Sequence, residues 1–351
     1  MYKLSFKSGS LIIDCESQDI DALNTYLKWD DRINVWRARA DHYRSIVMIL
    51  RENNSEFEDL CPDYKPIDIT MDSTLELRDY QNEALGKWEE GGKQGVIVLP
   101  TGVGKSIVGA AAIARTKRPA LVVLPTIDLM QQWASMLEKM FQQPIGMLGG
   151  GSRDVQDITV STYDSAVIMM EYIGNRFGFL ICDECHHLPG AVNRTLAEMS
   201  IAPFRMGLSA TPERDDGMEE VIFDLLGPEV YRRDIKEFST DTLSAYEVVR
   251  IEVELEEDEQ ETYDLNREIY RAFLSKYNIR FTGPQSWNRF IQQCARMPDG
   301  KEAMKAYMTQ KKISTSCRQK MLAIEGLLKT HAGERIIIFT HFQPIVSIKT
   351  L

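Results

Sequence analysis

The stretch VIVLPTGVGKSIVGAAA, residues 96–112, decides the fold. Apolar residues typical of a buried strand run into a glycine-rich turn that ends in GKS (residues 104–106), and an alanine-rich helix follows. This order is the context of a phosphate-binding loop, in which backbone N–H groups and a helix N-terminus hold an anion. The strict pattern has glycine where this sequence has Leu99, but Gly102 and Gly104 still supply the turn. The alternative is a turn of similar composition that binds no phosphate.

Two side chains of this turn have predicted chemical roles. Lys105 is expected to reach the β- and γ-phosphates of a nucleotide, and the Ser106 hydroxyl is expected to bind Mg²⁺. The residues expected to contact the nucleotide are Thr101, Gly102, Val103, Gly104, Lys105 and Ser106. The turn therefore predicts an enzyme that binds a nucleoside triphosphate together with Mg²⁺.

A second stretch, FLICDECHHLPG at residues 179–190, supplies the acids that such a loop requires. Enzymes of this kind need an acid at the end of a neighbouring strand to hold Mg²⁺, and often an adjacent acid to polarise the attacking water. Residues 179–182 are an apolar strand run, so Asp183 lies at the C-terminal end of the strand and Glu184 follows it. We therefore predict Asp183 as a metal ligand and Glu184 as the residue that acts on water.

Cys182 and Cys185 in the same stretch allow two other interpretations. With His186 and His187 they would give four zinc ligands, but from one tight stretch with no second paired cluster elsewhere in the sequence. A redox Cys-x-x-Cys pair is the other alternative, although two acids between the cysteines would disfavour the thiolate and lower its reactivity. We expect both cysteines to be packing residues.

The rest of the chain divides by pattern. From about 75 to 245, short apolar runs alternate with helix-length segments, which is typical of βαβ units and a parallel sheet. Residues 1–65 combine strand-like and helical stretches, and two prolines with turn formers over 62–74 indicate a linker. The predicted fold class is therefore α/β, with a doubly wound parallel sheet preceded by a small α+β domain.

The segment after residue 250 is strongly polarised in charge. Residues 252–268 carry nine acids and one base, whereas residues 271–329 carry twelve Lys or Arg and three acids. Attraction to the phosphates of DNA is the simplest use of such a basic excess, and a solvated charged face is the alternative. The lysines expected to contact DNA are Lys301, Lys305, Lys311 and Lys312.

The composition excludes several classes of protein. At 351 residues and 44% hydrophobic content, the chain is long enough for two or three folded domains. No apolar run approaches the roughly 20 residues that span a bilayer, and no signal-peptide core is present, so a cytoplasmic location without membrane contact is expected. Six scattered cysteines favour reduced thiols. The net charge of −11 argues against a protein that coats nucleic acid nonspecifically.

Four motifs stand in the order and spacing of superfamily 2 helicases: LRDYQ, LPTGVGKS, DECH and GLSATP. The stretches DECHH, ATPERDDG, STYDSA and GNRF further make the chain resemble the XPB family of DNA helicases, in its short archaeal form. The resemblance covers residues 1–351 and is densest over 75–245. It implies a RecA-like motor that uses ATP and Mg²⁺ to move 3'-to-5' along DNA and to unwind it, in DNA repair such as nucleotide excision repair and in transcription-related DNA opening.

The resemblance also implies roles for residues near the nucleotide. Gln81 matches the family's adenine-reading glutamine, with Arg78 beside the base, although a glutamine in this position is otherwise an ordinary surface residue. His186 matches the last position of the DEAH-type box, which couples the nucleotide state to domain closure. Without the resemblance, His186 would be an ordinary loop histidine.

Other residues are implied to act on DNA. Ser209 and Thr211 match the motif that links hydrolysis to strand movement, and a turn-capping pair is the alternative. Arg214, Asp215 and Asp216 occupy the place of an Arg-Glu-Asp element implicated in strand separation, with a middle side chain that is one methylene shorter here. A solvated loop that caps the following helix is the alternative.

The family's architecture implies three further segments. Residues 1–65 resemble a damage-recognition-like domain in which Trp29 and Trp36 would stack on distorted bases, although an excess of acids there favours packing instead. Residues 250–328 correspond to a helical thumb-like insert that grips DNA. Residues 330–351, with the strand-like GERIIIFTHF, correspond to the start of a second RecA-like domain that is truncated here. The later arginine-bearing motifs are missing, so these 351 residues alone are expected to hydrolyse ATP poorly.

The implied partners are DNA, at junctions of single strand and duplex, and a helicase-associated nuclease. A kinase or a GTPase would explain the phosphate-binding loop but not the other motifs. An RNA-acting helicase remains an alternative, because such motors contact mainly the nucleic-acid backbone. A non-catalytic docking module for partner proteins also remains an alternative, because the surface is acidic and the second motor domain is incomplete.

Overall fold

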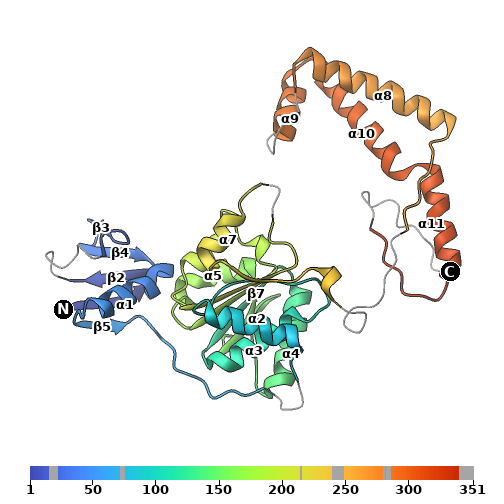
Figure 1. Ribbon diagram of the computed structural model, residues 1–351. Coiled ribbons are helices and arrows are strands. Elements are labelled where there is room, and N and C mark those ends of the chain that lie inside the picture. Colours follow the sequence, from blue (N-terminus) through green and yellow to red (C-terminus); the bar gives the residue numbers. More distant parts are fainter. Residues whose placement is uncertain are drawn as a thin grey trace. The chain divides into compact units, whose positions relative to one another are not determined.

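The structure is a computed structural model, and the residues it describes are 1–15, 23–71, 76–213, 216–238, 249–279, 281 and 286–339. The chain forms two compact units, Met1–Ala245 and Tyr246–Leu351 (Figure 1). The first unit contains a small N-terminal module, residues 1–60, and a parallel-sheet domain, residues 76–238.

In the N-terminal module, the described residues form a five-stranded sheet and one α-helix. The strand order is β3-β4-β2-β1-β5, in which β5 is parallel to β1 and the other neighbours are antiparallel. Leu11 and Ile13 of β2 are fully buried, as expected for alternate residues that share one face of a strand. The elements are β1 (Tyr2–Lys7), β2 (Ser10–Asp14), β3 (Lys28–Asp30), β4 (Val35–Arg39), η2 (Ala40–His42), α1 (Tyr43–Glu52) and β5 (Phe57–Leu60).

The described residues of the parallel-sheet domain form an eight-stranded sheet in the order β13-β6-β12-β11-β7-β10-β8-β9. All neighbouring strands are parallel except β8 and β9. The strands are β6 (Gln94–Val98), β7 (Ala120–Leu124), β8 (Gly146–Gly149), β9 (Ser152–Arg153), β10 (Ile158–Thr162), β11 (Phe179–Asp183), β12 (Phe204–Ser209) and β13 (Glu229–Arg232). The helices are α2 (Asp79–Glu90), α3 (Lys105–Thr116), α4 (Ile127–Phe141), α5 (Tyr163–Ile173), η3 (Cys185–His187), α6 (Arg194–Glu198), α7 (Glu219–Leu226) and η4 (Ile235–Glu237).

Helices cover both faces of this sheet (Figure 1). Ile97 and Ile181 belong to a core that they share with α2, α3 and α4. Their strand neighbours Val96 and Cys182 belong to a second core, shared with α5, α6 and α7. Because strand side chains alternate and both faces are covered, these strands read as continuous apolar runs. The predicted doubly wound α/β fold, with a small α+β domain before it, is confirmed.

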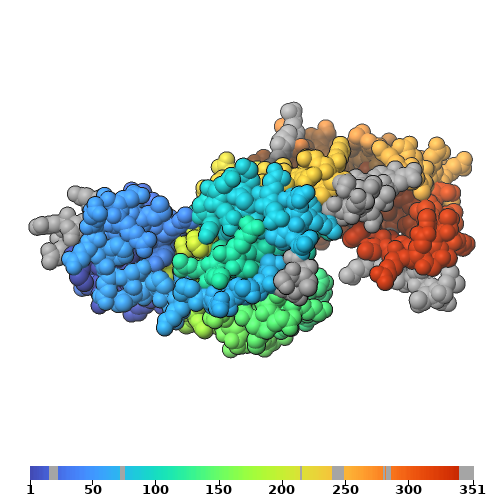
Figure 2. All heavy atoms as spheres, turned by 60° about the horizontal axis from the view of Figure 1, so that its bottom comes forward, coloured from blue at the N-terminus to red at the C-terminus, as the bar shows by residue number. Residues whose placement is uncertain are grey.

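The N-terminal module packs directly against the parallel-sheet domain (Figure 2). Arg44 of α1 donates hydrogen bonds to the backbone oxygens of Gly92 and Pro203 at 2.8 and 3.0 Å. Ile201 is 1% exposed and completes the core of the module. Gly92 precedes β6 and Pro203 precedes β12, so the module contacts the sheet at the amino ends of its strands.

In the second unit, the described residues form α8 (Glu257–Lys276), α9 (Ser286–Arg296), α10 (Gly300–Ser316) and α11 (Arg318–Thr330). Phe273 of α8 and Phe290 of α9 are buried together with residues of α10. Arg318 lies 2.7 Å from Glu256 and 3.6 Å from Glu259, so part of the basic excess is neutralised by the acidic segment. No helix among the described residues combines the length and apolar content that a bilayer crossing requires.

The strand predicted within GERIIIFTHF is wrong for the part of it that the structure describes. Residues 335–339 form no regular element, and Phe339 is 93% exposed. A strand is stable only beside partners that complete its hydrogen bonds and cover its apolar face, and no described strand pairs with these residues. The rest of the predicted segment, residues 340–351, lies outside the described residues.

Candidate nucleotide site

The phosphate-binding loop and the acid pair meet at one edge of the parallel sheet. Both β6 and β11 neighbour β12, and their carboxyl ends carry Lys105 and Asp183 to the same place. A cavity of about 420 Å³ lies there, with α4 forming one wall. The predicted residues that line it are Thr101, Gly102, Gly104, Lys105, Ser106, Asp183 and Glu184.

The backbone of the loop explains why its glycines are required. Gly102 and Gly104 have φ angles of 82° and 85°, a region that favours glycine. A Cβ atom on Gly104 would also lie 2.8 Å from Nε2 of Gln81. Helix α3 begins at Lys105, directly after this turn, so its first backbone N–H groups lie at the cavity, where they can hold an anion. Val103 differs from the prediction because it is 1% exposed and does not line the cavity.

The Lys105 side chain lies in the cavity and is only 10% exposed. Its Nζ donates to the backbone oxygens of Leu99 and Pro100 at 3.2 and 3.5 Å. Oε1 of Glu184 lies 3.9 Å from the same Nζ, a long ion pair. Neutral carbonyl groups are therefore the nearest acceptors of this amine.

Asp183 is 7% exposed, and both of its carboxylate oxygens accept a hydrogen bond. Nε1 of Trp133 donates to Oδ2 at 2.8 Å, and the backbone N–H of Glu184 donates to Oδ1 at 3.0 Å. Burial raises the pKa of Asp183, and the bond from Trp133 opposes that rise. Each carboxylate oxygen has two lone pairs, so each keeps one for a further ligand.

A short chain of polar contacts leads from Glu184 to the end of β12. Glu184 has a φ angle of 47°, which is uncommon for a residue with a side chain and ends β11 abruptly. Its Oε2 lies 3.5 Å from Nδ1 of His186, and that nitrogen lies 3.2 Å from Oγ of Ser209. Ser209 also accepts the backbone N–H of Thr211 at 3.2 Å.

This position corrects the grouping of Ser209 with the DNA-binding residues. Ser209 is 0% exposed, so its hydroxyl is out of reach of DNA in this conformation. The contact with His186 instead fits the implied link between hydrolysis and strand movement. Thr211, two residues further on, is exposed.

Gln81 is buried at 2% exposure, so the interpretation as an ordinary surface residue is wrong. Its Oε1 accepts the backbone N–H of Arg78 at 3.0 Å, and its Nε2 donates to the backbone oxygens of Val103 and Gly104 at 3.3 and 3.4 Å. The Arg78 side chain is exposed and donates to the hydroxyl of Tyr80 at 3.3 Å. Gln81 thus binds the backbone of the phosphate-binding loop through its side-chain amide. To read adenine, this amide would have to give up these hydrogen bonds and form new ones to the base.

The element for strand separation is only partly described. Arg214 and Asp215 lie outside the described residues. Oδ1 of Asp216 accepts the backbone N–H of Met218 at 3.2 Å, just before α7 begins at Glu219. Met218 is the N-cap residue of α7, and no side chain caps the helix, so this bond closes a turn before α7 and does not support the helix-capping interpretation.

The four predicted lysines all lie on α10. Lys301, Lys305 and Lys312 are exposed and share one helical face because their spacing is close to whole turns. Lys311 is half-buried, with its Nζ 5.9 Å from the centroid of the Tyr307 ring. Three of the four lysines are therefore placed to meet a ligand along one side of α10.

Cys182 and Cys185 are both fully buried in the core beneath α5, α6 and α7. Burial raises the pKa of Cys182 to about 12 and raises the pKa of Cys185 well above its usual value. Protonated, buried thiols are packing groups, as predicted.

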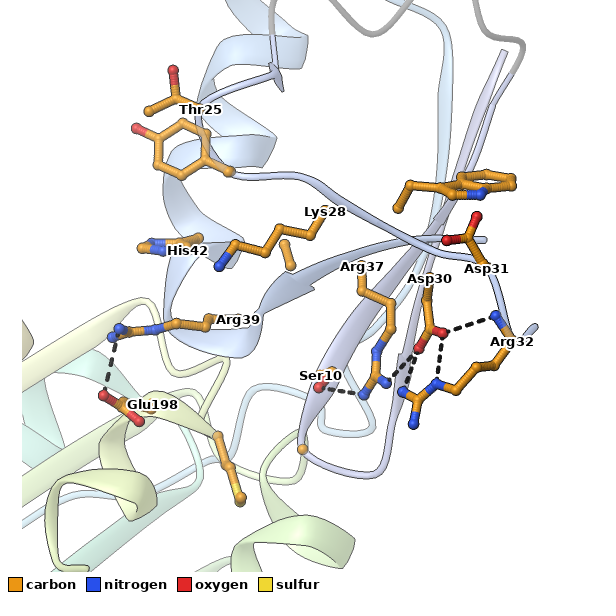
Figure 3. A pocket seen from close by; sticks show the side chains of 15 residues that line it. Ser10, Thr25, Lys28, Asp30, Asp31, Arg32, Arg37, Arg39, His42 and Glu198 are labelled. Atoms are coloured by element: carbon orange, nitrogen blue, oxygen red, sulfur yellow. Dashed lines mark hydrogen bonds and ion pairs between the residues drawn. The ribbon is translucent and has the colours of Figure 1, made fainter. Parts of the chain in front are cut away.

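A second cavity, of about 800 Å³, lies in the N-terminal module and reaches Glu198 of the parallel-sheet domain (Figure 3). Arg32 and Arg37 both donate to the carboxylate of Asp30, at 2.8 and 3.1 Å. Arg39 pairs with Glu198 at 3.4 Å. The guanidinium groups that line this pocket are thus already bound to carboxylates.

The two tryptophans of the module differ in exposure. Trp29 and Trp36 meet edge to face, with ring centroids 5.1 Å apart. Trp36 is half-buried, but Trp29 is 45% exposed and lines the pocket of Figure 3. The packing interpretation therefore holds for Trp36 and is only partly right for Trp29.

Comparison with known proteins identifies the family. Residues 4–60 match the family described as the Xeroderma pigmentosum group B helicase damage recognition domain, and residues 74–214 match the family described as Type III restriction enzyme, res subunit. The chain is 36% identical over 320 residues to the DNA 3'-5' translocase XPB2 of Sulfurisphaera tokodaii, covering 91% of this chain and 72% of that protein. The chain belongs to the XPB family of DNA helicases.

A second relative matches a smaller part of this chain. The DNA 3'-5' helicase XPB of Mycobacterium tuberculosis is 33% identical over 200 residues, which are 54% of this chain and 36% of that protein. Among solved structures, the Hef helicase domain of Pyrococcus furiosus has a TM-score of 0.45 and 19% identity, and the match covers 74% of this chain and 64% of that one.

Trp133 is the residue of this site that the sequence did not reveal. It lies on α4 and donates to the carboxylate of Asp183, 50 residues away in the chain. The only signal is the spacing of Leu129, Trp133 and Met136, which is also the spacing of an ordinary buried helix face. A contact between distant segments cannot be read from such a pattern.

Proposed function

We propose that this XPB-family chain is the nucleotide-binding part of an ATP-dependent DNA translocase that moves 3'-to-5' and unwinds DNA during repair. The supporting observation is the convergence of Lys105, Ser106, Asp183 and Glu184 on one cavity of about 420 Å³. Relatives whose names include a 3'-5' translocase and a 3'-5' helicase support the direction and the substrate. DNA is favoured over RNA because the names of these relatives specify DNA, and because residues 4–60 match a helicase damage recognition domain.

The donor atoms of the cavity fit Mg²⁺. Ser106 offers a hydroxyl oxygen and Asp183 a carboxylate oxygen, which are hard donors of the type that this ion prefers. The cavity leaves room for phosphates and water beside them. When bound there, Mg²⁺ neutralises the charge on the phosphates during phosphoryl transfer.

The chain's own residues divide the remaining work. The Lys105 amine exchanges its neutral carbonyl partners for phosphate oxygens, because bonds to a charged acceptor are stronger. The Glu184 carboxylate orients a water molecule and takes up its proton. Glu184 contacts His186, and His186 contacts Ser209 at the end of β12. A movement of Glu184 during hydrolysis would therefore move the end of β12.

DNA contacts would come from two places in the chain. Thr211 is exposed beyond β12, and the lysines of α10 provide a basic face in the helical second unit. The family resemblance gives this unit the role of a thumb-like insert. The bond from the Met218 N–H to Asp216 supports a structural role for that residue in the turn before α7, beside any action on the strands.

Hydrolysis by these 351 residues alone is proposed to be slow. Lys105 is the only cation among the described residues that line the cavity. Enzymes of this class use an arginine at the transferred phosphate, which typically accelerates turnover by about 10³–10⁵-fold. Binding assays are therefore more informative than turnover for this chain.

The proposal is tested in a chain that also carries the second motor domain, by measuring ATP turnover with and without single-stranded DNA or RNA, and strand separation on tailed duplexes of either polarity. DNA-stimulated turnover with 3'-to-5' separation is expected. Turnover stimulated equally by RNA would support the RNA-acting alternative. Absence of any nucleotide binding would support a docking module instead.

The family resemblance further supports a helicase-associated nuclease as a partner. The acidic net charge of −11 is compatible with a protein partner but does not specify one. Co-purification of the intact protein from its native lysate, with identification of the bound proteins, is the test. Recovery without any nuclease would count against this partner.

A further inference from the structure

The Mg²⁺ ligand proposed here is held by a residue from a different part of the domain. Nε1 of Trp133 donates to Oδ2 of Asp183 at 2.8 Å, and the two side chains are 3% and 7% exposed. The second carboxylate oxygen, Oδ1, accepts the backbone N–H of Glu184 at 3.0 Å. With one donor on each oxygen, the plane of the carboxylate is fixed.

The Trp133 ring is closely packed against helix α3. A Cβ atom on Gly109 of α3 would lie 2.7 Å from Cη2 of Trp133, at the edge of the ring. Gly109 has no positive φ angle that would explain a glycine, so the close approach of α4 to α3 explains it instead. The indole therefore has little freedom to turn away from Asp183.

Trp133 also lines the nucleotide cavity, together with Asp183 and Ser106. A neutral donor in this position can orient the carboxylate without competing for Mg²⁺ as a cation would. One lone pair on each oxygen stays free. Donors of this kind behind a metal ligand are commonly worth about 10–100-fold in metal affinity or activity.

We infer that Trp133 is a positioning residue that aims the Asp183 carboxylate at Mg²⁺ through its indole N–H. The inference rests on the proposed function, because it requires that Asp183 bind Mg²⁺ with a nucleotide. It goes beyond that function by assigning a role to α4, and it separates the donor function of the indole from its packing.

The test measures the affinity of the 351-residue chain for a non-hydrolysable ATP analogue by calorimetry, with saturating Mg²⁺ and with EDTA. The affinity with Mg²⁺ divided by the affinity in EDTA, which we call the Mg²⁺ ratio, reports how strongly Mg²⁺ strengthens nucleotide binding. In Trp133→Phe, which keeps a ring and loses the N–H, the ratio is expected to fall by about 10–100-fold. Affinity in EDTA is expected to change little.

Trp88 provides a matched control in the same domain. It is 0% exposed, and its Nε1 also donates a buried hydrogen bond, to the backbone oxygen of Arg205 at 2.8 Å. Trp88→Phe therefore removes a comparable indole N–H that does not face the cavity. Its Mg²⁺ ratio is expected to equal that of the wild type, and thermal unfolding shows whether both variants are equally folded.

A second variant distinguishes a donor from a packing group. Trp133→Gln restores an N–H donor but removes the ring, so it is expected to recover more of the Mg²⁺ ratio than Trp133→Phe does. If Phe is better than Gln, or if the ratio is unchanged in both, the inference is overturned.

The wild type alone gives an independent readout. In an ¹⁵N-indole spectrum, the Trp133 signal is expected to shift on adding Mg²⁺ to the nucleotide-bound chain, and no shift would contradict the inference. If the wild type binds nucleotide without any effect of Mg²⁺, the inference fails while the nucleotide site stands. If it binds no nucleotide, the proposed function itself fails.

Discussion

The nucleotide cavity and the pocket of the N-terminal module both bring cations and carboxylates together, but in different ways. In the cavity, Lys105 bonds to backbone carbonyls, and its nearest carboxylate oxygen lies 3.9 Å away on Glu184. In the pocket, Arg32 and Arg37 donate to Asp30 at 2.8 and 3.1 Å (Figure 3). Bonds from Arg32, and then from Arg37, hold the pKa of Asp30 well below its usual range.

This difference indicates which cations are available to a phosphate ligand. Neutral acceptors hold the Lys105 amine, and an incoming phosphate makes a stronger, charge-assisted bond. The arginines of the pocket already have charged partners, so a phosphate would have to displace a carboxylate. Arginines that are already paired with a carboxylate are therefore weaker support for an anion site than a buried amine that is held by neutral acceptors.

The largest effect is expected from Glu184→Gln, which would remove the proposed general base of the cavity and leave its cation, Lys105, in place. Loss of a general base typically lowers turnover by about 10²–10⁴-fold. In a chain that also carries the second motor domain, ATP turnover in the presence of DNA should fall by this range, while affinity for a non-hydrolysable analogue stays close to the wild-type value. Equal losses of affinity and turnover would mean that Glu184 binds the nucleotide and does not act on water.

A smaller effect is expected on the salt dependence of DNA binding, and it should differ between the lysines of α10 and the arginines of the pocket. Lys301, Lys305 and Lys312 form no ion pair with another described residue, unlike Arg32 and Arg37. Replacing the predicted set, Lys301, Lys305, Lys311 and Lys312, with glutamine should flatten the log-log salt dependence of DNA binding. The slope should fall by roughly one unit for each DNA phosphate that a lysine no longer neutralises.

The matched control for these lysines is the pair Arg32→Gln and Arg37→Gln. Because both guanidiniums are already paired, the slope should change less in this double variant than in the lysine variant. An unchanged slope in the lysine variant would make the face of α10 a solvated one. A larger change in the arginine variant would reverse the comparison between the two regions.

The smallest effect concerns His42, which lines the same pocket as the arginines. Burial lowers the pKa of His42 from its ordinary value of 6.5, and nearby Asp41 opposes this. The unfolded chain therefore takes up a proton below about pH 6.5 before the folded chain does, so acid favours unfolding in that window. Urea unfolding at about pH 7.5 and about pH 5.5, on either side of that ordinary value, should show a smaller loss of stability at the lower pH in His42→Gln than in the wild type.

The sequence predicted those parts of the molecule whose geometry is local. The loop at Gly102 and Gly104 requires positive φ angles, and the acids after residues 179–182 follow one apolar run, so both features are visible within a few residues. Alternating strand and helix patterns predicted the doubly wound sheet. The order of its strands, and hence which strand ends meet, depends on pairing between distant segments.

The failures have the same physical cause. The bond from Trp133 to Asp183 joins two chain segments, and so does the contact of Gln81 with the loop. The strand prediction for residues 335–339 is wrong because an apolar run forms a strand only where a neighbouring strand pairs with it. The composition of the run does not show whether such a neighbour exists. Pairing of Arg37 with Asp30 likewise depends on the pairing of β4 with β3.

The central claim is that the Lys105 amine is available to a nucleotide phosphate, and calorimetric titration of a non-hydrolysable ATP analogue with Mg²⁺ tests it most directly. Wild type and Lys105→Ala are compared, with thermal unfolding to confirm that both are folded. A hydrogen bond to a charged group is worth about 1.5–3 kcal/mol, so affinity should fall by about 10–150-fold in the variant. Equal affinity of the two proteins would contradict the account.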